Sequence, residues 1–573
     1  MKQVITIVVW LGAFLLAKSE LAYIWQNVDL KFRRGKGKFK IYILLILCLL
    51  SGIANGQEYQ WSVPVKGYLS AETNANPEAF LWIPPDCQQL RGLIIGQHNM
   101  CEEPIFEHAA FRQTMGELGF AILWISPGIN QQWDVKEGCQ QVLDEAIAVL
   151  AETSGYTELK HVPIVPLGHS AMATFPWNFA AWNPKKTLAI ISYHGDAPRT
   201  NLTGYGRENL EWGRNRNIDG IPGLMIEGEY EWWEARVNPA LAFRMMYPQS
   251  CVSFLSDVGH GHFDVSDQVV DYICLFLRKA AQYRLPKEQA IDKATELIAL
   301  NPKKGWLAER WHPDQKKRAP MASFDQYKGD PHDAFWYFDR EMAAATERYY
   351  SNENSKQQQF IGFTWKNRLL TFNAASHAQY QTTVEPEADG LTYLLSASFT
   401  DSTRSQLSDR HTKGKIRIDR ICGPIRKIND STFKVQFYRM GANNGKRSND
   451  IWLLASSLGD RTFKSSVQQL NLKIEYPLLV GKRQYILFPG LPDVHVDASP
   501  ARLQASSDAG LPIAYYIKAG PATVDGDRLI WTAIPPRAKY PIKVSVIAWQ
   551  YGQKGTIQSA EPVERYFYIN QQN

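Results

Sequence analysis

The sequence predicts an α/β domain, a mostly parallel sheet with helices on both faces, followed by two β-rich domains. Short apolar runs, such as residues 91–96, 120–126 and 162–167, alternate with segments of helical periodicity. This alternation is typical of crossover units that join parallel strands. The run 162–167 ends abruptly in small residues around Ser170. The β-rich part is indicated by short segments of alternating polarity beyond residue 360.

Length and charge limit the classes of function. The chain has 573 residues, with 63 basic against 57 acidic side chains and a net charge of +6. This length predicts three to four domains. Much of the positive surplus lies in residues 31–40, so no basic face indicates a nucleic-acid partner. No motif indicates a metal, a nucleotide or an organic cofactor.

Residues 1–56 are interpreted as a leader or signal peptide. A basic segment at 31–40 precedes an apolar run at 41–53 and small residues at 54–56. The mature chain is therefore expected to be exported, periplasmic or secreted, without a permanent membrane span. Six cysteines follow the leader, and they allow up to three disulfides or free buried thiols.

Residues 57–284 fit one α/β domain. Each expected strand is a short apolar run, and most of them are followed by a segment with helical spacing. The expected strands are 80–83, 91–96, 120–126, 162–167, 188–192, 221–226 and 252–256, and the expected helices are 104–118, 135–151, 175–182, 231–247 and 265–281.

Three motifs follow the ends of expected strands. The sequence Gly-His-Ser-Ala-Met at 168–172 has the pattern of a nucleophile elbow, a sharp strand-to-helix turn that exposes a serine hydroxyl. Its fifth residue, Met172, departs from the usual small residue. Gly-Glu-Tyr-Glu at 228–231 and Gly-His-Gly-His-Phe at 259–263 follow two later strands. Serine, carboxylate and histidine are the groups that nucleophilic acyl transfer needs.

These motifs, in this order, resemble the α/β-hydrolase superfamily over about residues 58–284. The resemblance implies a triad of Ser170 as nucleophile, His262 as base and Glu231 as the acid that orients the base. It also implies an oxyanion hole formed by the backbone amides of Ala171 and Met100. The alternatives left open are His260 for the base and Glu229, Glu227 or Asp196 for the acid.

The remainder of the chain is expected to hold a linker at 285–330, a β-rich domain at 331–483 and a β-sandwich at 484–573. A helix with an aromatic face is expected over residues 333–350. The last part resembles bacterial immunoglobulin-like repeats, on the segments 506–508, 510–515, 520–525 and 544–552. That resemblance implies a spacer or adhesive module.

The expected function is an exported serine esterase that acts on polysaccharide esters (acetyl, methyl or feruloyl) or on small esters. Tryptophans near strand ends would in part be core and in part form a sugar platform. The alternatives are a non-catalytic glycan-binding protein on a hydrolase scaffold, or a serine peptidase or lipase. The six tryptophans are Trp133, Trp177, Trp182, Trp212, Trp232 and Trp233.

Overall fold

The computed structural model describes residues 58–201, 208–230, 233–313, 315, 317–351, 353, 355–499 and 501–571. Residues 56–573 form one compact unit. The expected leader, residues 1–56, lies outside the described residues. Within the described ranges, no helix has the length and apolar character needed to cross a bilayer.

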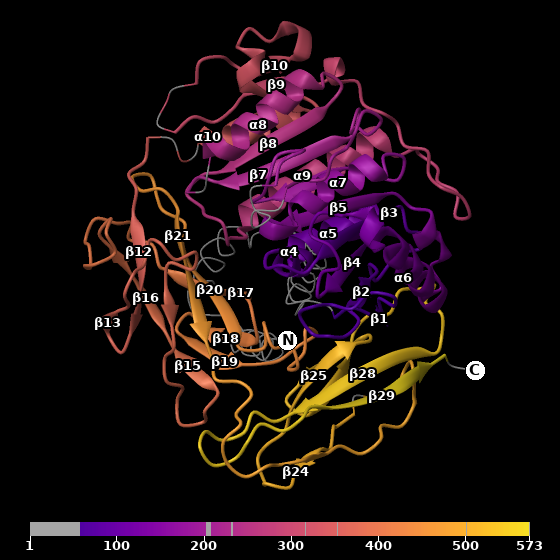
Figure 1. The fold of residues 1–573 in the computed structure, drawn as a ribbon, viewed down its shortest axis with the longest axis vertical. Coiled ribbons are helices and arrows are strands. Elements are labelled where there is room, and N and C mark those ends of the chain that lie inside the picture. The colour runs from indigo at the N-terminus through magenta and orange to yellow at the C-terminus, as the bar shows by residue number, and fades with distance from the viewer. Residues whose placement is uncertain are drawn as a thin grey trace, which may run out of the picture. The chain divides into compact units, whose positions relative to one another are not determined.

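The first part of the chain folds around an eight-stranded sheet in the order β1-β2-β4-β3-β5-β6-β7-β8 (Figure 1). The strand β2 pairs antiparallel with β1 on one side and with β4 on the other, and every later pairing is parallel. The strands are β1 Trp61–Pro64, β2 Glu78–Trp82, β3 Gly92–Gln97, β4 Phe120–Ser126, β5 Ile164–His169, β6 Ile190–Tyr193, β7 Pro222–Gly228 and β8 Cys251–Asp257.

Both faces of this sheet are covered. In β4, Ile122 and Trp124 belong to one apolar core, while Leu123 and Ile125 belong to another. Because neighbouring side chains of a strand point to opposite faces, the two cores lie on the two faces of the sheet. The helices are α4 Glu102–Glu107, α5 Ala109–Leu118, α6 Cys139–Ser154, α7 Thr174–Trp182, α8 Trp233–Met246 and α9 Asp267–Arg284. The predicted α/β-hydrolase fold class is confirmed.

Residues 302–351 add a small sheet and a helix to the edge strand β8. The sheet order is β10-β9-β11, and β11 packs on β8 through Ser253 Oγ, which donates to the Trp336 carbonyl at 2.6 Å. The expected helix over 333–350 is only partly present, because Phe335 and its neighbours form a buried strand against β9. A boundary between residues 330 and 331 would divide this sheet. The elements are β9 Trp306–Glu309, β10 Ala322–Ser323, β11 Ala334–Tyr337 and α10 Arg340–Ser351.

Residues 360–473, called here the middle domain, form three small sheets around an apolar core to which Tyr516, Ile547 and Trp549 also contribute. The sheet orders are β13-β12-β16, β14-β21-β20-β17 and β15-β19-β18. Its strands are β12 Phe360–Trp365, β13 Arg368–Leu369, β14 Gln381–Thr382, β15 Thr392–Leu394, β16 Ser396–Thr400, β17 Arg417–Cys422, β18 Ile425–Asn429, β19 Thr432–Val435, β20 Asp450–Ser457 and β21 Ser466–Lys473.

Residues 486–570 are also β-rich, as predicted, and are called the terminal domain. Its main sheet has the order β23-β29-β28-β25, and its core continues into that of α6. The immunoglobulin-like assignment stays a prediction. The strands are β22 Ile486–Leu487, β23 Val494–His495, β24 Ser506–Ser507, β25 Ala514–Ala519, β26 Ala522–Asp525, β27 Arg528–Trp531, β28 Ile542–Trp549 and β29 Val563–Asn570. The six cysteines of the described ranges are buried.

Candidate active site

The turn after β5 has the backbone geometry of a nucleophile elbow. Ser170 has a φ of 53°, in the left-handed region that side chains other than glycine rarely adopt. A Cβ at Gly168 would lie 2.0 Å from the Met172 carbonyl oxygen, so only glycine fits there. A short 3₁₀ turn, Ser170–Met172, then leads into α7. Strain of this kind at a serine points to a functional role for its hydroxyl.

The structure brings together Ser170 and His262. The Nε2 atom of His262 lies 2.6 Å from Ser170 Oγ. The His262 carbonyl accepts from His169 Nε2 and from His194 Nδ1, both at 2.9 Å. A carbonyl oxygen only accepts, so both of these ring nitrogens carry a hydrogen. Two buried imidazoles from the ends of β5 and β6 therefore fix the backbone of the loop after β8.

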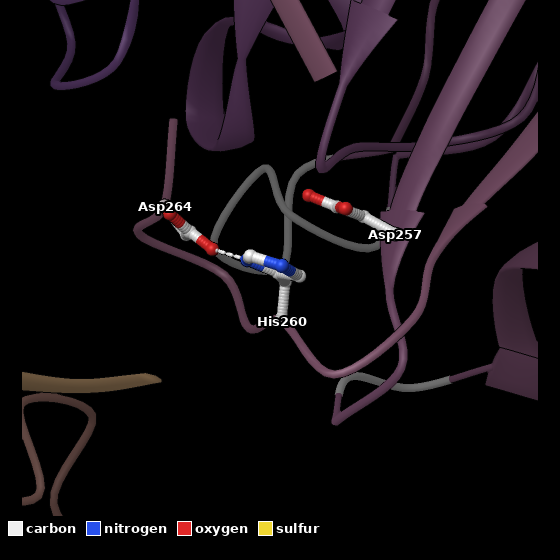
Figure 2. A group of neighbouring side chains, drawn as sticks. All are labelled: Asp257, His260 and Asp264. Atoms are coloured by element: carbon white, nitrogen blue, oxygen red, sulfur yellow. Dashed lines mark hydrogen bonds and ion pairs between the residues drawn. The ribbon is translucent and has the colours of Figure 1, made fainter. Parts of the chain in front are cut away.

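His260, the alternative base, lies between two carboxylates rather than beside Ser170. Figure 2 shows its ring between Asp257 and Asp264, with Nδ1 bonded to Asp264. Burial alone would lower the pKa of His260, but the two negative charges raise it to about 10. The hydroxyl of Tyr349 donates to Asp257. A histidine held as a cation at neutral pH cannot act as a general base.

The three side chains of Figure 2 also offer two oxygens and one nitrogen within 4.8 Å of one another, a set that could hold a metal ion. In the structure, however, His260 and Asp264 bind each other, and Tyr349 binds Asp257. A charged histidine between carboxylates supplies the positive charge that a cation would bring. These three side chains therefore form a buried ion-pair network.

Four carboxylates are candidates for the acid that orients the base. Glu231 lies outside the described residues. Glu229 accepts from the Gly259 amide at 2.7 Å and pairs with Lys464 at 2.8 Å. Glu227 and Asp196 both face the buried guanidinium of Arg236, at 2.7 and 3.6 Å. Each of the three described carboxylates thus has a cation beside it.

The loop after β3 is held by a carboxylate that sequence reasoning missed. Glu102 is fully buried, and its two oxygens accept from the amides of His169 (2.8 Å), Asn99 (3.1 Å) and Met100 (2.9 Å). The Met100 amide, expected in the oxyanion hole, therefore donates to Glu102. Ala171, the other expected donor, is buried directly after the nucleophile. Burial raises the pKa of Glu102 to about 7, although the three amides lower it.

No local signal reveals Glu102, because an acidic residue in the first turn of a helix is ordinarily solvated and favoured by the helix dipole. One of its partners, His169, lies at the end of β5, 67 residues away. Only the contact between β3 and β5 in the folded sheet brings them together.

The tryptophans near the strand ends are largely core. Trp133, Trp177 and Trp212 are at most 1 % exposed, and Trp182 is covered by the guanidinium of Arg216 at 4.4 Å. Trp232 and the side chain of Trp233 lie outside the described residues. The expected sugar platform therefore has no support from the four described rings.

No protein-family model matches the chain, and no curated protein matches its sequence. Among solved structures, the protein Est1E from Butyrivibrio proteoclasticus is similar at 17% identity, over 38% of this chain and 98% of its own, with a TM-score of 0.25. The fluorophosphonate-binding serine hydrolase FphF from Staphylococcus aureus matches at 12% identity, over 40% and 98%, with a TM-score of 0.27. An esterase from Pyrobaculum calidifontis matches at 12%, over 41% and 89%, with a TM-score of 0.30. At these TM-scores the similarity carries no argument, and the fold assignment rests on the sheet itself.

Proposed function

We propose that this chain is a serine hydrolase that cleaves carboxylic esters through an acyl-enzyme on Ser170. The observation that carries the proposal is the 2.6 Å contact between Ser170 Oγ and His262 Nε2 at a strained elbow. A serine hydroxyl is a weak nucleophile until a neighbouring base takes its proton. The backbone bonds that hold the His262 carbonyl keep that base in place.

In the proposed reaction, His262 Nε2 takes the Ser170 proton as Oγ attacks the carbonyl carbon of the ester. The resulting imidazolium returns the proton to the alcohol oxygen, and the carbon–oxygen bond to the alcohol breaks. A water molecule then attacks the acyl-enzyme in the same manner. His262 takes the proton of this water and passes it to Ser170 Oγ as the carboxylic acid leaves.

Glu231 is proposed as the carboxylate that orients His262. The chain leading to it lies against the histidine loop, since the Tyr230 amide donates to the His260 carbonyl at 3.2 Å. Ala171 is proposed as the first oxyanion donor. The Met100 amide serves as the second donor only by sharing its hydrogen between Glu102 and the oxyanion.

The proposed substrates are acetyl, methyl or feruloyl esters of polysaccharides. This part rests on the expected leader at 1–56, which would export the enzyme, and on the expected adhesive module at the C-terminus. Because fold does not fix substrate, the acyl group and the glycan are to be found by screening.

The test is covalent labelling of the purified protein with a fluorophosphonate probe, together with turnover of 4-nitrophenyl acetate. Labelling and turnover are expected in the wild type and in Ser405→Ala, which alters an exposed loop of the middle domain. Both are expected to vanish in Ser170→Ala. A folded wild type that is neither labelled nor active would refute the proposal and would favour the non-catalytic glycan-binding alternative.

A further inference from the structure

The middle domain contacts three loops that lie near the Ser170–His262 pair, those after β3, β7 and β8. Arg447 Nη1 donates to the Asn99 carbonyl, in the loop after β3, at 2.7 Å. Lys464 pairs with Glu229, in the loop after β7, and these side chains are only 4 % and 7 % exposed. Such a buried pair fixes the two surfaces against each other, because either charge alone would be costly.

The loop after β8 meets the same domain. Trp452 packs on Phe263 with ring centroids 4.8 Å apart. At Gly259, where φ is +81°, an added Cβ would lie 2.4 Å from Ser465 Oγ. The domain thus approaches the histidine loop as closely as the loop's backbone permits.

One side chain of the middle domain reaches the base itself. The ring of His377 lies edge-on to that of His262, with centroids 5.3 Å apart, and 4.8 Å from that of Phe263. His377 is exposed, whereas His262 is partly exposed and Phe263 is buried. His377 is thus a neighbour of the base that solvent also reaches.

The loop that carries His377 is held firmly. The Asn373 amide donates to the Gln379 carbonyl at 2.8 Å and closes the loop. Gln469 and Gln468, both in β21, donate to the His377 carbonyl at 3.1 Å and to the Gln379 side chain at 2.8 Å. A wall built on such a loop keeps its place when a substrate enters.

We propose that His377 forms the wall of the leaving-alcohol side of the hydrolytic site and limits the size of the alcohol that the enzyme releases. The inference rests on the proposed function. The alcohol oxygen must face His262, because His262 returns the proton to it. Groups attached to that oxygen therefore lie beside the ring of His377, whereas the acyl chain extends from the other side of the carbonyl carbon.

The test compares kcat/KM for acetate esters of a small and a bulky alcohol, ethyl acetate and cyclohexyl acetate. In His377→Ala the bulky-to-small ratio is expected to rise about fivefold or more, since pocket space for a few carbons changes selectivity at least this much. The ratio for 4-nitrophenyl butyrate over 4-nitrophenyl acetate, which differ in the acyl chain, is expected to stay within twofold.

Two variants serve as controls. His377→Phe keeps a ring at the wall and is expected to keep the wild-type ratios. His411→Ala removes a histidine that stacks on Phe399 within the same domain, and it is also expected to keep them. A bulky-to-small ratio in His377→Ala that stays within twofold of wild type, or falls, would overturn the proposal.

A second measurement does not require ester hydrolysis. In a Ser170→Cys background, the rates of modification by methyl and by benzyl methanethiosulfonate report access to position 170. Adding His377→Ala is expected to raise the benzyl-to-methyl ratio about fivefold, and an unchanged ratio would count against the wall. An unlabelled, inactive wild type with a raised thiol ratio would refute only the proposed function.

Discussion

Two histidines of one loop, two residues apart, lie in opposite environments. His262 is partly exposed and meets the hydroxyl of Ser170, while His260 is buried between Asp257 and Asp264. The carboxylates hold His260 as a cation, which removes it from proton transfer at neutral pH and makes it part of the structure. The two histidines of this motif therefore have different roles. His260 stabilises the loop through its ion pairs, and His262 contacts the hydroxyl of the nucleophile.

The largest expected effect is a loss of activity on substitution of His262, which should leave stability nearly unchanged. His262→Gln is expected to lower kcat for 4-nitrophenyl acetate by about 10⁴-fold, because no base then takes the Ser170 proton. The melting temperature is expected to stay close to that of the wild type, since a partly exposed side chain is lost. Steady-state kinetics and thermal unfolding check this. Near-normal activity in this variant would assign the base to another residue.

The next largest expected effect is a loss of stability on substitution of His260. His260→Gln is expected to reduce the free energy of unfolding by about 3–5 kcal/mol, because two buried carboxylates lose their cation. Urea unfolding followed by tryptophan fluorescence measures it. The double variant with Asp264→Asn removes one of the two charges and is expected to recover part of the loss. A variant as stable as wild type would contradict the buried ion-pair network.

The stability lost in His260→Gln is expected to decrease as the pH rises. The folded pKa of His260, about 10, is higher than the value near 6.5 that an unfolded histidine has. Its contribution is therefore complete below about pH 6.5 and is lost as the pH rises towards 10. The difference in stability between wild type and His260→Gln is expected to shrink over this range, and a difference that grows would contradict the assignment.

A smaller effect on kcat is expected from substitution of Glu102, the buried carboxylate that binds the backbone next to Ser170. Glu102→Gln is expected to lower kcat by about 100-fold, because the amide cannot accept from His169, Asn99 and Met100 together and the elbow shifts against the loop after β3. Glu103→Gln, on the neighbouring residue, breaks ion pairs with Arg420 and Arg439 and serves as the control. It is expected to retain kcat, and equal losses in both variants would argue against a specific role for Glu102.

The smallest expected effect concerns the hydrogen bond between Tyr349 and Asp257, one of the two carboxylates beside His260. Tyr349→Phe removes the hydroxyl that donates to Asp257 and leaves the ring in place. The expected loss is about 1.5–3 kcal/mol of unfolding free energy, the contribution of a hydrogen bond to a charged group. Chemical unfolding measures it, with kcat expected to remain within a few-fold of the wild type. A neutral substitution would show that Asp257 is satisfied by other groups.

Much of the α/β part could be predicted from the sequence because its signals are local. Apolar runs of strand length, helical spacing and the small residues around Ser170 all act within a few residues. Ser170 follows β5 and His262 follows β8, and the ends of both strands lie at the same edge of the sheet because the strands run parallel. At residues 334–337 the local sequence favoured a helix, but pairing with β9 makes this segment a strand.

The rest of the site depends on contacts between distant segments. Glu102, Arg447 and His377 carry no motif, and each acquires its place only when another strand or domain packs against it. The role of the Met100 amide could not be settled from its position after β3, because the buried carboxylate that engages it is invisible in the sequence. Long-range packing, rather than residue type, decides such details.

The attachment of the terminal domain has a practical consequence for producing the protein. Gly520 donates to the Tyr59 carbonyl at 3.0 Å, Lys539 to the Ser154 carbonyl at 2.9 Å, and Arg537 pairs with Glu158 at 2.7 Å. Apolar side chains of this domain continue the core beneath α6. Cutting the gene after residue 483 is expected to uncover that core and yield aggregated material, so recombinant expression has to retain residues 484–573.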